Sequence, residues 1–129
     1  MSRTNIIARC HCGAVELELP RKPAVITRCN CSYCRQIDPL FAYYKRRTIR
    51  FRSSAKHLES YTWGRGVLQW FRCRHCGSFT HHAPVGQPGP EARLGVNMRL
   101  VQPEVLRGTT AKLRDGARNT WRVLEVHVL

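Results

Sequence analysis

Hydrophobic and polar residues alternate at intervals of two along much of the chain. Between Ala14 and Leu19, valine and leucine occupy every second position and glutamates stand between them. A period of two places the two sets of side chains on opposite faces of a strand, so this stretch predicts a half-buried β-strand. In the stretch 48–52, Ile49 and Phe51 are expected to face inward by the same rule. Similar stretches predict strands at 24–28, 40–44, 48–52, 57–63, 67–72, 78–82, 93–101 and 121–128.

Turn-forming residues separate these stretches. Gly64-Arg65-Gly66 is typical of a hairpin turn between the strands on either side. The segments 84–90 and 108–120 have the composition of loops, the first rich in Pro and Gly and the second polar. Helical character is limited to single turns at 32–37 and after Pro103. The sequence therefore predicts a mostly β fold, with all 129 residues in a single domain.

All seven cysteines fall in three short clusters, a grouping typical of metal coordination. The clusters are Cys10-His11-Cys12, Cys29-Asn30-Cys31-Ser32-Tyr33-Cys34 and Cys73-Arg74-His75-Cys76. Zinc takes four ligands in a closed structural site and keeps one position open in a catalytic site. Three thiols within six residues suit one ion and two separated pairs suit another, although exchanging a pair between the sites satisfies the same count. The sequence predicts two zinc ions, held by four and by three thiols.

The odd number of cysteines and their close spacing favour thiolates over disulfides. No stretch approaches the roughly 18 apolar residues of a membrane-spanning helix, and the first nine residues lack the apolar segment of a signal peptide. We therefore expect no membrane association and a reducing, cytoplasmic compartment, where disulfides are rare. Disulfide pairing is the alternative.

The chain is strongly basic, with a formal net charge of +14. Seven thiolates subtract seven charges and two zinc ions add four, which leaves about +11. Between Pro39 and Arg74, nine lysines and arginines accompany a single acid, Glu59. Such an excess attracts anions, either a small acidic substrate or a nucleic-acid backbone. An arginine-rich surface without a specific partner is the alternative interpretation.

Five motifs occur in order along the chain. They are Cys10-His11-Cys12-Gly13-Ala14-Val15, Cys29-Asn30-Cys31-Ser32-Tyr33-Cys34-Arg35, Tyr61-Thr62-Trp63-Gly64, Phe71-Arg72-Cys73-Arg74-His75-Cys76-Gly77 and Val96-Asn97-Met98-Arg99. Together they resemble the glutathione-dependent formaldehyde-activating enzyme family, which shares its domain with centromere protein V. The resemblance extends over about residues 6 to 125. Asp115-Gly116, followed by Trp121, is similar to a loop of the family with a longer gap.

The resemblance implies a mostly β, Mss4-like fold that is stabilised by zinc. It also implies which thiols belong to which ion. The closed structural site takes Cys10, Cys12, Cys73 and Cys76, and the open site takes Cys29, Cys31 and Cys34.

The open site is the implied catalytic centre. Three thiolates leave a zinc ion with a net charge of about −1, which weakens it as a Lewis acid and suits it to bind a further thiolate. The resemblance implies a carbon-sulfur lyase with glutathione or a related thiol as co-substrate. The enzyme forms or cleaves an S-hydroxymethyl adduct with formaldehyde or a similar electrophile. Arg35, directly after the cluster, and Arg28 on the preceding strand are expected near the bound thiolate.

A second class of function uses the same residues. In it the chain is a non-catalytic, zinc-stabilised binding module for nucleic acid or a protein, with Lys45 to Arg74 as its basic surface. A histidine then closes the three-thiol site, and the candidates are His57, His81 and His82. The other histidines within the motifs, His11 and His75, are expected to be exposed or to support the metal site from outside. The tryptophans are expected to pack in or near the core rather than to contact substrate; they are Trp63, Trp70 and Trp121.

Overall fold

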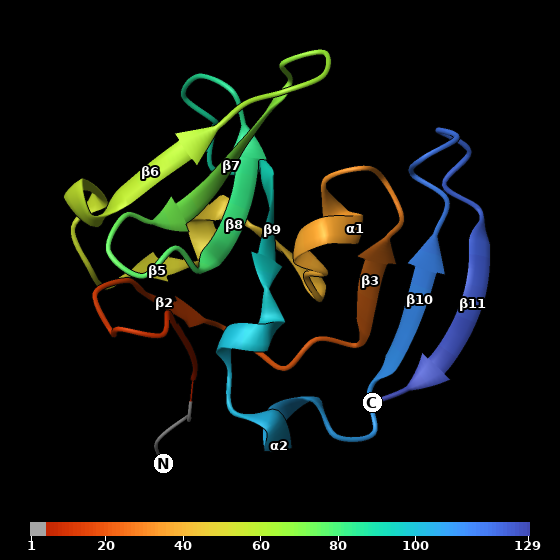
Figure 1. Cartoon of the computed structure of the whole chain (residues 1–129). Helices are drawn as coiled ribbons and strands as arrows, with labels where there is room; N and C mark the ends of the chain where they lie inside the picture. The colour runs from red at the N-terminus through yellow and green to blue at the C-terminus, as the bar shows by residue number, and fades with distance from the viewer. Residues whose placement is uncertain (1–4) are drawn as a thin grey trace.

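The structure, a computed structural model that describes residues 5–129, consists of a small and a large β-sheet (Figure 1). The small sheet has the order β1-β2-β5, and the large sheet has the order β11-β10-β3-β4-β9-β8-β7-β6. The small sheet contains β1 (Ile6–Arg9), β2 (Glu16–Leu19) and β5 (Arg50–Phe51). The large sheet contains β3 (Val25–Cys29), β4 (Phe41–Lys45), β6 (Leu58–Tyr61), β7 (Leu68–Cys73), β8 (Phe79–Pro84), β9 (Arg93–Asn97), β10 (Thr110–Arg114) and β11 (Val123–Val128).

Helical elements are short throughout residues 5–129. They are α1 (Cys34–Ile37), α2 (Pro103–Leu106) and the 3₁₀ turns η1 (Arg46–Thr48), η2 (Ala55–His57) and η3 (Met98–Leu100). None of the helices in this range is long and apolar enough to cross a lipid bilayer. The predicted mostly β fold is confirmed, as are the helical turns at α1 and α2 and the hairpin between β6 and β7.

One face of the large sheet forms the main core together with the small sheet. Ile26, Leu94 and Val96 are buried on this face, and Leu17 and Leu19 reach them from β2. Successive residues along a strand point to opposite faces, so the strand residues next to these buried ones face the other side of the sheet.

The other face carries a second, smaller hydrophobic cluster. Phe41, Trp70 and Phe79 are buried there and pack with Cys34 of α1. The end of β3 places Cys29 beside the same cluster. The division between the faces separates the main core from the residues around the three-thiol cluster.

Strand β10 is the main departure from the predicted elements. The segment 108–120 was predicted to be a polar loop, which is wrong for residues 110–114. This strand runs parallel to β3, with Ala111 beside Ile26 and Arg114 beside Cys29. Its contribution to the main core is the small side chain of Ala111, so the sequence lacks a hydrophobic signal there. The parallel pairing of β10 with β3, which is distant in the chain, also leaves no signal in the local sequence.

Smaller departures occur at four other places. Strand β1 was not predicted. Phe51 was expected to face inward and is 41% exposed, because β5 has two residues and pairs only with β2. The strand predicted at 93–101 ends at Asn97, where η3 begins. The last predicted strand begins at Val123, because Trp121 has a positive φ of 59° and lies in the preceding turn.

Candidate metal centres

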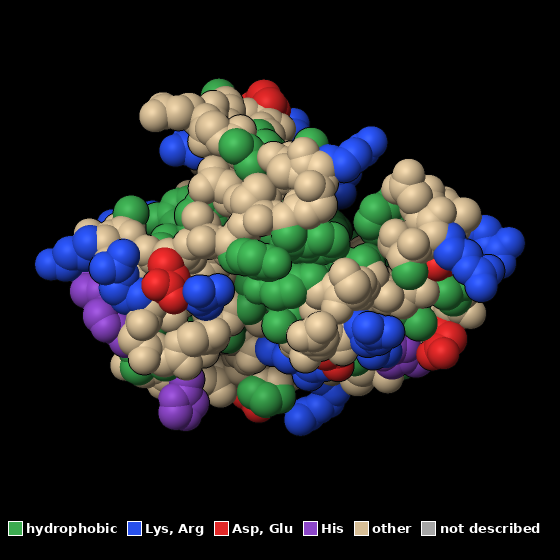
Figure 2. Space-filling view, turned by 45° about the horizontal axis from the view of Figure 1, so that its top comes forward, with side chains coloured by type: hydrophobic (Ala, Val, Ile, Leu, Met, Phe, Trp, Pro, Cys, Tyr) green, Lys and Arg blue, Asp and Glu red, His purple; other side chains and the backbone are tan. Residues whose placement is uncertain are grey.

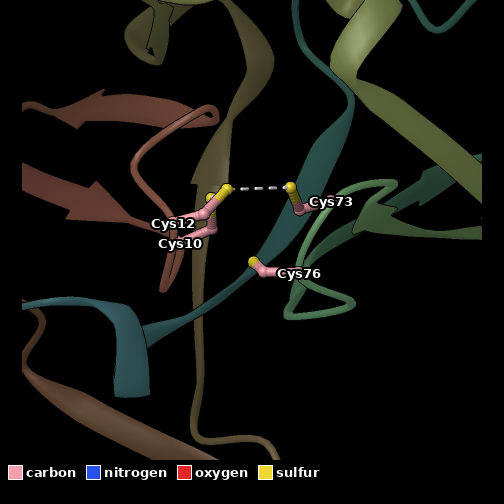
Figure 3. A group of neighbouring side chains, drawn as sticks. All are labelled: Cys10, Cys12, Cys73 and Cys76. Carbon is pink, nitrogen blue, oxygen red and sulfur yellow. Dashed lines mark hydrogen bonds between the residues drawn. The ribbon is translucent and has the colours of Figure 1, made fainter.

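The first thiol cluster joins the two sheets (Figure 3). Cys10 and Cys12 lie in the turn between β1 and β2, Cys73 ends β7, and Cys76 lies in the turn before β8. Their Sγ atoms are all within 4.8 Å of one another. The Sγ of Cys12 is 3.8 Å from that of Cys10 and 3.7 Å from that of Cys73.

These separations match those of tetrahedral zinc. Four sulfurs at about 2.3 Å from one ion lie about 3.8 Å apart along the edges of a tetrahedron. A disulfide requires about 2.05 Å, and all seven cysteines are free, so the structure contains no disulfide between them. Backbone N–H groups point at two of the sulfurs, from Val15 to Cys10 at 3.3 Å and from His75 to Cys73 at 3.4 Å, and such donors favour thiolates. The four residues fit a zinc ion.

Two tight turns bring the four thiols together. Gly13 and Gly77 follow the thiol pairs with φ of +86° and +79°, a backbone region that favours glycine. The Gly77 N–H donates to the carbonyl of Cys73 at 2.9 Å and closes the second turn. His11 and His75 are exposed, as predicted.

The second thiol cluster lies at the connection between β3 and α1. Cys29 is the last residue of β3 and Cys34 the first of α1, with Cys31 in the loop between them. The three Sγ atoms are within 4.8 Å of one another. The N–H of Cys31 points at the Cys29 sulfur and that of Cys34 at the Cys31 sulfur, both at 3.4 Å. The cluster therefore has the donors and the spacing to hold a metal ion.

The thiols of this cluster differ in acidity. A hydrogen bond from the Cys34 thiol lowers the pKa of Cys29 to about 6, and the same contact raises the pKa of Cys34. Backbone hydrogen bonds from Cys31 and Gly116 also lower the pKa of Cys29. The thiol of Cys29 is therefore more acidic than that of Cys34.

No fourth side-chain ligand joins the three thiols among the described residues 5–129. His57 lies near the first cluster instead, with its Nδ1 2.9 Å from Nε2 of His75. His81 faces the main core, where its ring stacks on Phe71 with the centroids 4.6 Å apart. His82 is on the same face as the three thiols, but its ring packs between Phe41 and Trp70, at 4.9 and 5.0 Å between centroids. Side chains of residues 5–129 therefore offer three ligands at this cluster, one fewer than at the first cluster.

A cavity of about 500 Å³ opens beside the three thiols. Its wall includes one Arg or Lys side chain, Arg65, and a group of aromatic residues, which are Phe41, Tyr43, Trp63, Trp70 and Trp121. Figure 2 shows hydrophobic side chains gathered in the middle of one face, with Lys and Arg toward the rim. Trp70 is buried and Trp63 is half-buried, as predicted for residues in or near the core, whereas Trp121 is 50% exposed, more than that prediction implied. We name this space the thiol cavity.

The loop after β10 is docked against the three-thiol cluster. A Cβ added at Gly116 would lie within 3.0 Å of the Cys29 sulfur. Asn30, between two of the cysteines, donates from Nδ2 to Asp115 at 3.1 Å and accepts the N–H of Ala117 at 2.9 Å. The Asp115 side chain is buried, and hydrogen bonds from Asn30 and Thr120 hold the pKa of its carboxyl below the usual range. Sequence reasoning missed the role of Asn30, although its place between two candidate ligands was a usable signal.

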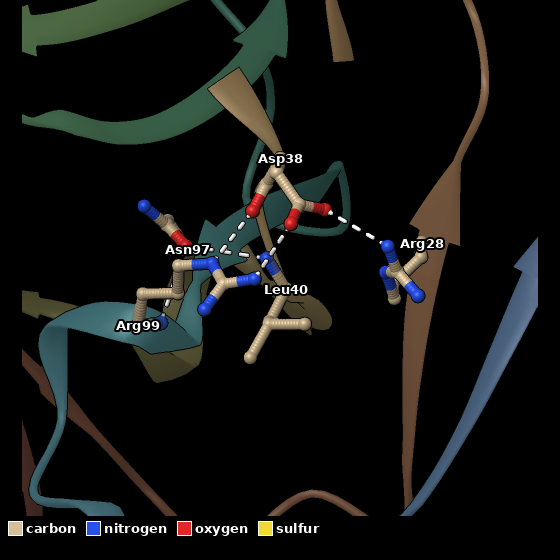
Figure 4. Close-up of polar contacts among 5 residues, drawn as sticks. All are labelled: Arg28, Asp38, Leu40, Asn97 and Arg99. Atoms are coloured by element: carbon tan, nitrogen blue, oxygen red, sulfur yellow. Dashed lines mark hydrogen bonds and ion pairs between the residues drawn. The ribbon is translucent and has the colours of Figure 1, made fainter. Parts of the chain in front are cut away.

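The end of α1 is fixed by two residues of the fifth motif (Figure 4). Asp38 has a φ of +47° at the C-terminus of α1, and its backbone carbonyl accepts a hydrogen bond from Nε of Arg99 at 2.6 Å. The Arg99 Nη2 also contacts the Asp38 carboxylate at 2.9 Å. Asn97 accepts the N–H of Leu40 at 3.3 Å. These contacts hold α1, and with it Cys34, against β9.

The structure distributes the predicted cationic residues away from the three thiols. Arg35 is exposed on α1 and does not line the thiol cavity, while Arg28 pairs with Asp38 at 3.3 Å. Within the basic stretch, four of the nine cations form ion pairs; they are Lys45 and Arg47 with Glu91, Arg52 with Glu16, and Arg72 with Glu59. Part of that charge is therefore balanced locally.

Known proteins resemble this chain in sequence and in fold. Residues 5–105 match the model of a family described as glutathione-dependent formaldehyde-activating enzyme. A crystal structure of a Rhodobacter sphaeroides protein is similar at a TM-score of 0.65 and 31% sequence identity, over 80% of this chain and 96% of that one. The matched region contains both thiol clusters. The chain belongs to the glutathione-dependent formaldehyde-activating enzyme family.

Proposed function

We propose that the chain is a zinc-dependent carbon-sulfur lyase that acts on an adduct of glutathione or a related thiol. Cys10, Cys12, Cys73 and Cys76 hold a structural zinc, and Cys29, Cys31 and Cys34 hold a second zinc at the catalytic centre. The whole chain forms the one domain that carries both ions. We place this chemistry in the reducing cytoplasm, where thiols stay free.

One observation carries the proposal: the three-thiol cluster has no fourth protein ligand among the described residues and adjoins a cavity. A purely structural zinc site is closed by four protein ligands, as the first cluster can be. The binding-module alternative has less support, because part of its basic surface is ion-paired and no histidine closes the second cluster.

Bound zinc supplies a positive charge that keeps a substrate thiol ionised at neutral pH. The protein's part is to position the thiol and to exclude water. Gly116 leaves room beside Cys29, since a side chain there would meet the sulfur. Trp70 and Phe41 form a buried floor, and His82 beside them is neutral because burial lowers its pKa to about 4.

The reaction in this cavity is an addition and its reverse. The substrate thiolate adds to the carbonyl carbon of the aldehyde, a carbon-sulfur bond forms, and the π electron pair moves to oxygen, which takes a proton. In reverse, the hydroxyl loses its proton, the carbon-sulfur bond breaks, and the thiolate and aldehyde are released. No oxidant or reductant is consumed.

The activity is tested by exchange spectroscopy with carbon-13 formaldehyde and glutathione. We expect zinc-loaded protein to increase the rate of exchange between free formaldehyde and the S-hydroxymethyl adduct above the spontaneous rate. Cys31→Ser should lose the increase, and Arg50→Gln, an exposed change on β5, should retain it. The proposal fails if the wild-type protein gives the spontaneous rate.

A further inference from the structure

A second cavity of about 750 Å³ adjoins the thiol cavity. The two share Tyr43 and Trp121 in their walls. Three arginines from separate parts of the chain line the second cavity: Arg21 follows β2, Arg93 opens β9, and Arg114 ends β10. We name this space the arginine cavity.

The three arginines are free to bind an anion. No acidic residue lines the arginine cavity, and none of the three is ion-paired to an acid within residues 5–129. Other arginines of this chain are also unpaired, so the significant feature is that these three meet at one cavity. A carboxylate accepts paired N–H groups from a guanidinium, which makes arginine well suited to recognise it.

Aromatic contacts keep two of the guanidinium groups in place. Arg93 lies over the ring of Tyr43 at 4.6 Å from its centroid, and Arg21 lies over Tyr44 at 5.5 Å. Contact with a ring face occupies the flat side of a guanidinium and leaves the N–H groups at its edge available. Arg114 uses one N–H to hold the carbonyl of Trp121 at 3.0 Å. Each of the three guanidinium groups therefore has a protein contact that orients it.

Strand β3 contributes residues to both cavities. Cys29 and Val25 lie on the same face of β3, and four residues along a strand span about 13 Å. Val25 lines the arginine cavity and Cys29 lines the thiol cavity. The cavities also share Tyr43 and Trp121, and Arg114 of the arginine cavity pairs with Cys29 across β10 and β3. A thiol the size of a tripeptide, which spans about 10 Å when extended, can therefore place its sulfur in one cavity and a carboxylate in the other.

We propose that the arginine cavity binds a carboxylate of the same thiol whose sulfur enters the thiol cavity. This inference rests on the proposed function and narrows its substrate class to peptide-sized thiols with a free carboxylate remote from sulfur. Small neutral thiols reach the three-cysteine cluster without gaining the second contact.

The carboxylate contact is tested with S-methylglutathione, which keeps both carboxylates but cannot form a thiolate. Isothermal titration of zinc-loaded protein uses a low-salt buffer free of carboxylate and phosphate. We expect millimolar or tighter binding that weakens as salt is added, and no binding of the diethyl ester of the same compound. Equal binding of the acid and the ester, or no binding of the acid at millimolar concentration, would overturn the proposal.

Variants locate the contact. Arg93→Gln and Arg21→Gln should each weaken binding of S-methylglutathione by about tenfold, as expected for loss of a charge-assisted hydrogen bond. Arg50→Gln removes the same charge at an exposed position on β5 outside both cavities and should change nothing. Thermal melts confirm that each variant is folded. Equal affinity for all three variants and the wild type would place the anion elsewhere and contradict the proposal.

A parallel titration separates this proposal from the proposed function. Cobalt in place of the second zinc reports on thiol coordination, and 2-mercaptoethanol requires no carboxylate site. If thiols change the cobalt spectrum while the arginine variants bind S-methylglutathione normally, the arginine cavity is excluded and the catalytic site stands. If S-methylglutathione binds through the arginines while no thiol changes the cobalt spectrum, the carboxylate site stands and the lyase proposal fails.

Discussion

The sulfur of Cys29 lies against Gly116, which comes from the loop between β10 and β11. A Cβ at position 116 would fall within 3.0 Å of this sulfur and at most 3.0 Å from atoms of the Trp121 ring. Real Cβ atoms essentially never approach other atoms so closely. The position therefore requires glycine for packing, and the loop is part of the wall around the three thiols.

Gly116→Ala should displace Cys29 and weaken the second metal site without unfolding the domain. We expect zinc content to fall from two ions per chain toward one after dialysis against a weak chelator, as measured by elemental analysis. Gly89→Ala is the matched control, because its added Cβ meets no atom within 4 Å and its φ is not positive. Two ions retained by Gly116→Ala would contradict the assigned role of this glycine.

Loss of a ligand from the first cluster should destabilise the fold far more than loss of one from the second. Zinc binding at a structural site is part of the folding free energy, and the first cluster joins the turn before β2 to the end of β7. We expect Cys12→Ser and Cys73→Ser to unfold or to melt at a much lower temperature. Cys31→Ser should stay folded and lose the second metal. Similar melting temperatures for all three variants would contradict the division into structural and catalytic sites.

Stability should fall in mild acid partly because of the buried histidine His81. Burial lowers its pKa from 6.5 to about 3, so below pH 6.5 the unfolded chain binds a proton that the folded chain does not. The resulting loss grows by up to about 1.4 kcal/mol per pH unit between pH 6.5 and 3. His81→Phe retains a ring for stacking on Phe71 and removes the group whose protonation causes this loss of stability. Urea unfolding at pH 7 and pH 5.5 should show a smaller loss for the variant, and equal losses would refute the assignment.

The hydrogen bonds of Asn30 should matter for the second site rather than for the fold. Asn30→Ala removes the donor to Asp115 and the acceptor for the Ala117 N–H, which frees the loop from the three-thiol cluster. We expect a change in Trp121 fluorescence and about tenfold weaker binding of the second metal, from the loss of about two hydrogen bonds. Gln36→Ala, on the exposed side of α1, is the control. Unchanged metal affinity would mean that the loop does not support the site.

Much of the candidate site could be predicted from the sequence because its signals are local. Cys29, Cys31 and Cys34 lie within one loop and one helical turn, so their proximity follows from chain geometry. The grouping of Cys10 and Cys12 with Cys73 and Cys76 did not follow in the same way, because spacing alone also allowed a pair of thiols to be exchanged between the two sites. The fold determines which pairs share a site, because it brings the turn after β1 beside the turn after β7.

The rest depends on the order of strands in the large sheet. Pairing of β10 with β3 places Arg114 beside Cys29, although 84 positions separate them in the chain. In β10 only Ala111 is deeply buried in the main core, and Arg114 at the end of the strand lines a cavity, so the strand has no clear hydrophobic pattern. Arg35 illustrates the opposite case, since it is adjacent to Cys34 in sequence and exposed on α1.

The central claim is that the three-thiol metal accepts a thiolate from outside the protein. It is tested most directly by titrating glutathione into protein with cobalt at the second site, because a fourth sulfur ligand strengthens the sulfur-to-metal absorption band. We predict a saturable increase with glutathione, release of a proton, and no such increase with S-methylglutathione, whose sulfur cannot ionise. No change with millimolar glutathione, or an equal change with both compounds, would contradict the account.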